Sequence, residues 1–346
     1  MGERSGTAVN ARHGSVHRRS PVFPVLIVIV LGLSLAAACI GAYPMGLKDV
    51  LSALAGTASA HDQAAIVLFS IRLPRIAAAL VLGACLAAAG AVYQQIFRNP
   101  LVSPDILGVS AGSGLGAVLG IFMSLPVFGI QLMAFVGGLG AVGLVMLIAS
   151  MVRRQDSVLV LVLSGIVIGA LAGSVTSLLK VLADPYDQLP AITFWLLGSL
   201  ATVDISDVWA ALPVALLALV PLVLLQWKVD ILSMGDEEAR ALGVDVSKVR
   251  LTLITGATLM TASVVSFAGV VGWVGLIIPH FARMLVGPGF VRLLPASILI
   301  GSAFMLLVDT LARTVSVTEV PLGIITSVIG APIFVVLLAR GRRVWS

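Results

Sequence analysis

The stretch Gly235-Asp236-Glu237-Glu238-Ala239-Arg240-Ala241-Leu242-Gly243 is a polar island between two apolar runs, residues 207–227 and 249–270. Nine charged residues lie between Lys228 and Arg250, in a chain of which only 11% is charged. The three acidic residues follow a glycine and suit the first turn of a short helix, where carboxylates meet the positive end of the helix dipole. The closing glycine is well placed to end that helix. The island predicts a structured, water-facing segment between membrane spans.

The composition around this island belongs to a membrane protein. Hydrophobic residues make up 59% of the chain, whereas soluble domains carry about 25% charged residues. The apolar runs are near-continuous rather than alternating with period two, which argues against an outer-membrane barrel. We therefore predict an all-α integral membrane protein with several spans.

Ten apolar runs are long enough to cross, or nearly cross, a hydrocarbon core of ~30 Å. They lie at residues 22–43, 74–97, 105–124, 127–151, 157–182, 207–227, 249–270, 272–287, 293–312 and 321–340. The first run exceeds the 7–15 residues of a signal-peptide core, the obvious alternative. It is therefore predicted to be a retained span, with residues 1–20 as a basic cytoplasmic tail and 21–346 as one transmembrane domain. The weakest prediction is 272–287, which is short and contains Pro279, His280 and Arg283.

Ten spans place both termini on one side of the membrane. Most of the 21 Lys and Arg residues then share that side, which the positive-inside rule assigns to the cytoplasm. The segment 228–250 faces the cytoplasm as well. The basic residues left on the outer side are Lys48, Arg72, Arg75, Lys180 and Arg313.

Two sets of glycines recur every four residues: Gly108, Gly112, Gly116 and Gly120, and then Gly165, Gly169 and Gly173. Small residues at that spacing form a smooth ridge on which another helix can lie closely. The alternative is a groove that lines a substrate path. Separately, Arg75 and Pro104 recur as Arg250 and Pro279 at the same spacing, in spans of opposite direction. That pattern is a weak sign of an inverted repeat.

Several kinds of chemistry are missing from the chain. It has no G-x-x-x-x-G-K-[ST] phosphate loop, no catalytic triad and no H-E-x-x-H metal motif. Cys39 and Cys85 lie in apolar runs and are predicted to be small core residues. Asp309 is the acid placed well inside a span, four residues before Arg313, which predicts a helical ion pair. We expect no catalytic residue, metal or cofactor in this chain.

A transporter that cannot hydrolyse nucleotide itself needs a separate subunit to supply the energy. The polar island offers a surface on which such a subunit could dock. Ala239 and Leu242 add an apolar face beside its charges. The alternative is a solvated loop that only separates two helices. Because the chain has no phosphate loop of its own, we favour the interpretation that the island binds a partner protein.

Ordered motifs then identify a family. The chain resembles the permease subunits of bacterial ATP-binding-cassette (ABC) importers for iron–siderophore complexes, haem and cobalamin, from Arg72 to Leu338. The motifs are Arg72-Leu73-Pro74-Arg75, Asn99-Pro100-Leu101 through Pro104 to Leu107-Gly108-Val109-Ser110, Phe194-Trp195-Leu196-Leu197-Gly198-Ser199-Leu200, the island 235–243, Gly275-Leu276-Ile277-Ile278-Pro279-His280 with Arg283, Asp309 with Arg313, Glu319-Val320-Pro321-Leu322-Gly323 and Ile329-Gly330-Ala331-Pro332-Ile333-Phe334.

The resemblance implies a bundle of about ten transmembrane helices like that of cobalamin-importer permeases, in the bacterial inner membrane. Two permease subunits, a homodimer in the favoured version, would form the pathway at their interface. Two cytoplasmic ATPase subunits that use ATP and Mg²⁺ would dock on the coupling region 228–250. The implied contact residues are Gly235, Asp236, Glu237, Glu238, Ala239, Arg240, Leu242 and Gly243.

The resemblance also implies a periplasmic or lipid-anchored substrate-binding protein at the outer face. Its glutamates would pair with Arg72, Arg75 and Arg313, for which headgroup snorkelling is the alternative. The segment 183–200 would form a short helix near the gate, with Phe194, Trp195, Gly198 and Ser199 along the pathway; for Trp195 an aromatic interface anchor is equally compatible.

The substrate leaves little trace in the sequence. An iron(III)–siderophore complex is the commonest substrate of the resembled family and is favoured, while haem, cobalamin and molybdate stay open. A self-powered secondary transporter, driven by an ion gradient and dependent on Asp309, is the alternative from another class. No nucleic-acid partner is expected.

Overall fold

The structure of the protein is a computed structural model that describes residues 22–41, 43–56, 63–152 and 157–340. Within those ranges every regular element is helical, which confirms the all-α prediction. The predicted tail of residues 1–20 lies outside them. The elements are α1 (Val22–Cys39), α2 (Leu47–Leu54), α3 (Gln63–Val67), the π-helical turn η1 (Leu68–Arg72), α4 (Leu73–Ile96), the 3₁₀ turn η2 (Pro104–Leu107), α5 (Val109–Phe122), α6 (Val127–Met151), α7 (Ser157–Leu182), α8 (Gln188–Leu197), α9 (Ile205–Leu224), α10 (Gln226–Met234), α11 (Asp236–Ala241), α12 (Val246–Ala268), α13 (Val274–Val286), α14 (Phe290–Thr314) and α15 (Leu322–Arg340).

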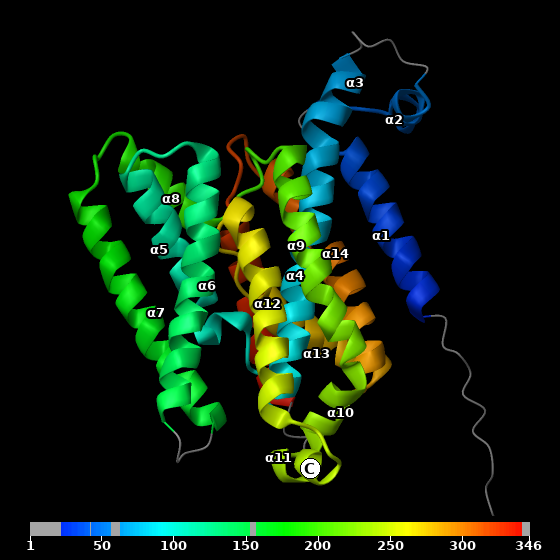
Figure 1. Cartoon of the computed structure of the whole chain (residues 1–346). Coiled ribbons are helices and arrows are strands. Elements are labelled where there is room, and N and C mark those ends of the chain that lie inside the picture. Colours follow the sequence, from blue (N-terminus) through cyan, green and yellow to red (C-terminus); the bar gives the residue numbers. More distant parts are fainter. Residues whose placement is uncertain (1–21, 42, 57–62, 153–156, 341–346) are drawn as a thin grey trace, which may run out of the picture.

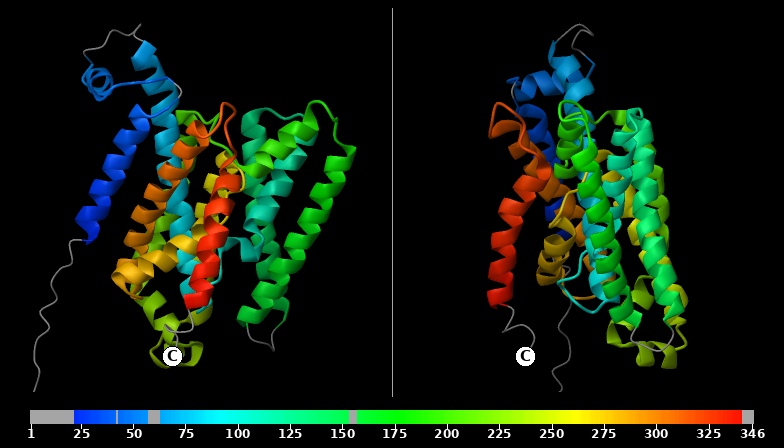
Figure 2. Two further views of the ribbon diagram at one scale, coloured as in Figure 1. Left: turned by 180° about the vertical axis from the view of Figure 1, so that it is seen from behind. Right: turned by 90° about the vertical axis from the view of Figure 1, so that its left-hand side faces the viewer.

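The helices form one bundle. Figure 1 shows α1 at one side and α7 at the other, with α4 between them. The two further views in Figure 2 show the same order, with α15 on the face opposite α12. The short helices α2 and α3 lie beyond one end of the bundle, and α11 lies beyond the other end (Figure 1).

Each of the ten predicted spans coincides with a helix. Among the described residues, seven helices are long and apolar enough to cross a membrane: α1, the continuous stretch Gln63–Ile96 that contains α4, α6, α7, α9, α12 and α14. The other three predicted spans are the shorter apolar helices α5, α13 and α15. The chain is therefore a multi-pass membrane protein.

Two predicted spans are only partly helical. α5 begins at Val109 because the preceding turn η2 starts at a proline and Gly108 has the left-handed φ of +80°. α13 begins after a non-helical segment, 269–273, in which Trp273 has a φ of +72°. With 14 and 13 residues at about 1.5 Å per residue, each helix covers about 20 Å. Hydropathy alone could not separate these helices from the apolar segments that lead into them.

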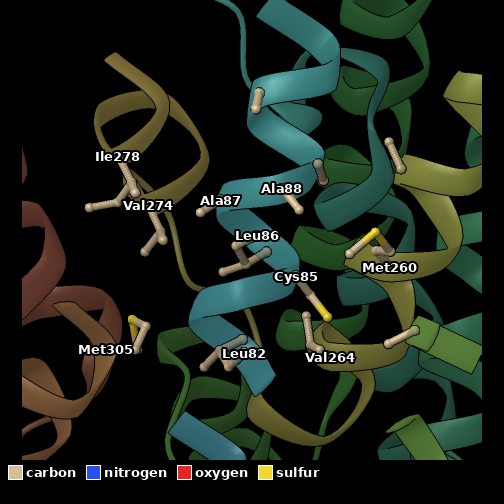
Figure 3. Packing of buried hydrophobic residues seen from close by; sticks show 14 of the residues in the cluster. Leu82, Cys85, Leu86, Ala87, Ala88, Met260, Val264, Val274, Ile278 and Met305 are labelled. Carbon is tan, nitrogen blue, oxygen red and sulfur yellow. The ribbon is translucent and has the colours of Figure 1, made fainter. Parts of the chain in front are cut away.

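The core of the bundle surrounds α4, which packs against α12, α13 and α14. Small residues allow this close approach: Gly83 meets Gly301 of α14, and Gly90 meets Gly275 of α13. Figure 3 shows Leu82, Cys85 and Leu86 of α4 among Met260, Val264, Val274, Ile278 and Met305 of the three neighbouring helices. Cys85 is 3% exposed, so its predicted place in the core is confirmed.

The two glycine ridges differ in what they contact. In α5, a Cβ on Gly112 or Gly116 would lie 2.4 or 2.0 Å from a backbone carbonyl oxygen of α6. The first ridge is therefore a helix-packing surface, as predicted. In α7, Gly165 lies against η2, whereas a Cβ on Gly173 would meet no atom within 4 Å. Packing within this chain accounts for only part of the second ridge.

The helices that carry the predicted repeat run in opposite directions. α4 descends from the α3 end of the bundle, and α12 rises from the α11 end (Figure 1). Arg75 lies in the first turn of α4, and Arg250 in the second turn of α12. Each guanidinium is buried and bound to a carboxylate, at opposite ends of the bundle. This arrangement is the one that an inverted repeat requires.

Candidate functional site

The polar island forms α11, as its glycine and acid pattern predicts. The helix covers Asp236–Ala241, and Gly235 before it has a φ of +144° that favours glycine. Gly243 has a φ of +79°, and its N–H donates to the carbonyl of Arg240 at 2.9 Å. The two glycines thus delimit the helix at the positions where the sequence predicts them.

The faces of α11 differ from the prediction in one respect. Ala239 is fully buried against its own chain, so it offers no apolar surface to a partner. Leu242 is 60% exposed, and Glu237, Glu238 and Arg240 are exposed as well. The open surface of the helix is therefore charged, with a single large apolar side chain. A six-residue helix is too short to persist on its own, so the buried Ala239 helps to hold it in place.

Asp236 faces the bundle rather than the solvent. Its two carboxylate oxygens accept hydrogen bonds from Nη2 of Arg250 at 2.8 and 3.0 Å. Nη2 of Arg98, just beyond the end of α4, lies 4.0 Å from the nearer oxygen. Arg250 is the last residue of the predicted coupling region 228–250, whereas Arg98 belongs to this site without having been predicted.

Two further acids near α11 accept hydrogen bonds from backbone N–H groups in the first turns of α14 and α12. Asp230 of α10 accepts the backbone N–H of Phe290, the first residue of α14, at 2.7 Å. Asp245 caps α12, because its Oδ1 accepts the N–H of Lys248 at 3.1 Å. That backbone hydrogen bond lowers the pKa of the Asp245 carboxyl, and the side chain of Lys248 lowers it further.

At the opposite end of the bundle, two of the predicted arginines, Arg75 and Arg313, form a charge cluster with Asp309 and Glu319. Arg75 Nη2 lies 2.7 Å from Oδ1 of Asp309, and Arg75 Nη1 lies 2.5 Å from Oε1 of Glu319. Arg313 Nε lies 3.2 Å from Oδ2 of Asp309, which confirms the predicted i, i+4 pair. The two pairs that Arg75 makes were not predicted, because their partners are more than 230 residues away in the chain.

Arg72 and Arg313 also donate hydrogen bonds to backbone carbonyl oxygens. Arg72 donates to the carbonyls of Ala38, Cys39 and Tyr43, at the end of α1. Arg313 donates to the carbonyl of Ala37 at 3.1 Å. The predicted docking residues are therefore not free surface cations: Arg72 is 3% exposed and Arg75 is 4% exposed. Of the cluster, Glu319 is the most open, with a side chain that is 39% exposed.

The predicted gate segment connects three elements. Phe194 and Trp195 lie on α8, where Phe194 is 63% exposed and Trp195 is partly buried. Gly198 has a φ of +72°, and its carbonyl accepts the N–H of Leu322 at the start of α15 at 2.9 Å. The N–H of Ser199 donates to the carbonyl of Ala268 at the end of α12, also at 2.9 Å. The segment therefore joins the ends of α8, α12 and α15.

Among the residues that the structure describes, no group of three His, Cys, Asp or Glu side chains could hold a metal ion. Asp309, which an ion-coupled carrier would need, is 1% exposed and lies between two arginines. A carboxylate fixed in this way acts as a counter-ion for its neighbours.

The site and the fold define a class: a polytopic helical permease with a charged helix outside the membrane-embedded part. The FecCD transport family model matches residues 26–340, so the chain belongs to the FecCD transport family. Members of this family are ABC importer permeases and not enzymes, since the ATPase is a separate subunit. Membership of this family rules out the alternative of a secondary transporter driven by an ion gradient.

Relatives and a solved structure agree over nearly the whole chain. The chain is 40% identical to the molybdate import system permease protein MolB of Haemophilus influenzae, over 92% of this chain and 94% of the relative. It is also 40% identical to the Fe(3+)-citrate import system permease protein YfmE of Bacillus subtilis, over 94% and 97%. An inward-facing structure of a putative metal-chelate type ABC transporter matches with a TM-score of 0.84 and 37% identity, over 92% of this chain and 99% of that one.

Proposed function

We propose that this chain is the permease subunit of a bacterial inner-membrane importer for an iron(III) chelate, with iron(III)–siderophore complexes favoured. A relative that imports iron(III) citrate and the match to a transporter of metal-chelate type support this substrate class. The relative that imports molybdate is the main competitor. In this proposal both termini and α11 face the cytoplasm, in agreement with the distribution of Lys and Arg.

The exposed surface of α11 is the observation that carries the mechanism. The helix lies beyond the apolar part of the bundle (Figure 1) and presents Glu237, Glu238, Arg240 and Leu242. Charged groups around one large apolar side chain suit a partner protein better than lipid. We assign this surface, within the coupling region 228–250, to one of two ATPase subunits that use ATP and Mg²⁺.

The pathway in this proposal lies between two copies of the chain. The outer half of α7 exposes Gly173, Ser174 and Ser177, although it belongs to a membrane helix. Small and polar surfaces at membrane depth are usually covered by another helix or line a water-filled path. A homodimer that brings α7, α8 and α15 to the interface accounts for this surface and places Phe194 and Trp195 at the pathway.

The substrate-binding protein is proposed to dock at the opposite end of the bundle. Arg72, Arg75 and Arg313 are the predicted cations for its carboxylates. Because they are already bonded within the chain, an incoming carboxylate would exchange with the accessible Glu319 on Arg75.

The first test separates ATPase docking from substrate identity. Reversing both Glu237 and Glu238 to Lys should release the ATPase from the purified permease, while the permease stays monodisperse in detergent. Unchanged ATPase co-purification would remove α11 from the interface. Cells that depend on the complete system should take up ⁵⁵Fe-labelled siderophore, and uptake of ⁹⁹Mo-labelled molybdate instead would reassign the substrate.

A further inference from the structure

Asp236 has a different environment from the other acids of α11. Its side chain is 23% exposed, and it meets Arg250, whose side chain is 9% exposed. Glu237, the next residue, is exposed. The carboxylate of Glu238 folds back over Gly235, where a Cβ would lie 2.0 Å from its Oε2. Of the three acids, Asp236 alone forms an ion pair among the described residues.

The partners of Asp236 lie on the two most deeply buried spans. Arg250 belongs to α12, and Arg98 follows α4; these two long helices have the largest buried shares, 72% and 78%. Arg98 also has a φ of +48°, which is unusual for a residue with a side chain. One carboxylate therefore connects α11 with the two helices around which the bundle is packed.

We propose that Asp236 is a positioning residue that passes the movement of α11 to α12 through Arg250, and to the end of α4 through Arg98. This inference rests on the proposed docking of an ATPase at α11. It reassigns Asp236 from a contact with the ATPase to a contact within the permease, and it leaves Glu237, Glu238, Arg240 and Leu242 as the surface for the partner.

Two physical arguments support the coupling of α11 to α12 and α4 through Asp236. Asp236 links the short helix α11 to Arg250 and to Arg98, so a displacement of α11 acts on the helices that carry these arginines. Removing the carboxylate leaves a largely buried guanidinium with less negative charge beside it, which is costly. The arginine would then take other partners, and α11 could shift without displacing α12.

The test uses the complete transporter in liposomes and does not depend on the substrate. In a background with Cys39 and Cys85 changed to Ala, a cysteine replaces Ser174, Ser177 or Ser327, which are exposed on α7 and α15. Labelling by a membrane-impermeant maleimide is followed with and without ATP, and the position with the largest ATP-driven change is used. Asp236→Asn is compared with the matched control Asp187→Asn, at an exposed aspartate far from α11.

Asp236→Asn should retain the ATPase and its ATP hydrolysis, while the ATP-driven change in labelling falls by about 2- to 30-fold, the range that residues along coupling networks control. Asp187→Asn should leave the change intact. A merely structural loss would lower ATPase attachment as well. If Asp236→Asn is not recovered from membranes, Asp236→Glu, which displaces the charge by one methylene, takes its place with the same expectation.

Three results would overturn the inference. An undiminished ATP-driven change in Asp236→Asn would show that the pair carries no movement. Loss of the ATPase from Asp236→Asn would make the residue a direct contact, and the proposed docking would stand. No ATP-driven change at any of the three cysteines of the otherwise unaltered protein would show that no movement reaches these helices. Failure of ATPase docking itself is recognised separately, by an ATPase that stays bound when Glu237 and Glu238 are reversed.

Discussion

Arg75 and Asp309 form a buried ion pair that joins the first turn of α4 to the last turns of α14, with 2.7 Å between Nη2 and Oδ1. Their side chains are 4% and 2% exposed. Asp309 also meets Arg313, so one carboxylate serves two guanidinium groups. Such a cluster holds the outer ends of the central helices together and depends strongly on its single shared acid.

Asp309→Asn should therefore destabilise the permease severely. The amide keeps the shape of the side chain but leaves two buried arginines without their shared charge, and breaking a buried pair costs about 3–5 kcal/mol. Thermal melting in detergent, followed by tryptophan fluorescence, measures the effect. Asp187→Asn is the control, because Asp187 is exposed and should melt like the unaltered protein. Equal melting of both variants would refute the structural role of Asp309.

Glu319→Gln should strengthen capture of the substrate-binding protein. The partly exposed carboxylate of Glu319 is paired with Nη1 of Arg75. A carboxylate of the substrate-binding protein therefore has to compete with Glu319 for this guanidinium. Partly exposed pairs contribute about 0.2–1 kcal/mol, which corresponds to an affinity gain of about 1.4- to 5-fold. Surface plasmon resonance on the permease in nanodiscs measures the affinity.

Arg72→Glu together with Arg75→Glu provides the opposite change and should weaken capture. Because both arginines are buried and Arg75 pairs with Asp309, the variant should also be less stable, so capture is measured on the monodisperse fraction that keeps its ATPase. A Glu319→Gln variant with the affinity of the unaltered protein would exclude competition by Glu319. An unaltered affinity in the double arginine variant would remove the arginines from the docking surface.

The sequence predicted features that depend on local pattern. The glycines around the acidic island placed α11 to within one residue, and the long apolar runs located the seven helices of the described residues that are long enough to cross a membrane. The pairing of Asp309 with Arg313 followed from their spacing along one helix turn. Each of these inferences uses residues that are close in the chain.

Contacts between residues that are distant in the chain could not be predicted from the sequence. The partner of Arg75 lies 234 residues away at Asp309, and no spacing rule connects them. Ala239 looked like part of an exposed apolar face, but a neighbouring helix covers it. The positions of Arg98 and Arg250 around Asp236 follow from the packing of α4 against α12, which periodicity does not determine.

Gly235→Ala should weaken ATPase attachment more than Gly243→Ala. Both glycines have positive φ angles, +144° and +79°, so alanine strains the backbone at either position by about 1–3 kcal/mol. Only at Gly235 would the new Cβ also lie 2.0 Å from the carboxylate of Glu238, which displaces a side chain on the docking surface. Co-purification of the ATPase measures the difference, and equal retention by both variants would contradict it.

Gly90→Ala should disrupt the bundle itself, because α4 and α13 cross in direct backbone contact at this residue. An added Cβ would lie 1.9 Å from the carbonyl oxygen of Gly275, and forcing extra atoms into a packed core costs about 1–3 kcal/mol or more. We expect a lower melting temperature and a smaller monodisperse fraction on size-exclusion chromatography. Gly140→Ala in α6 is the matched control, since its Cβ would meet nothing within 4 Å and alanine favours the helix by about 1 kcal/mol. If the two variants behave alike, the close contact between α4 and α13 is not what holds these helices together.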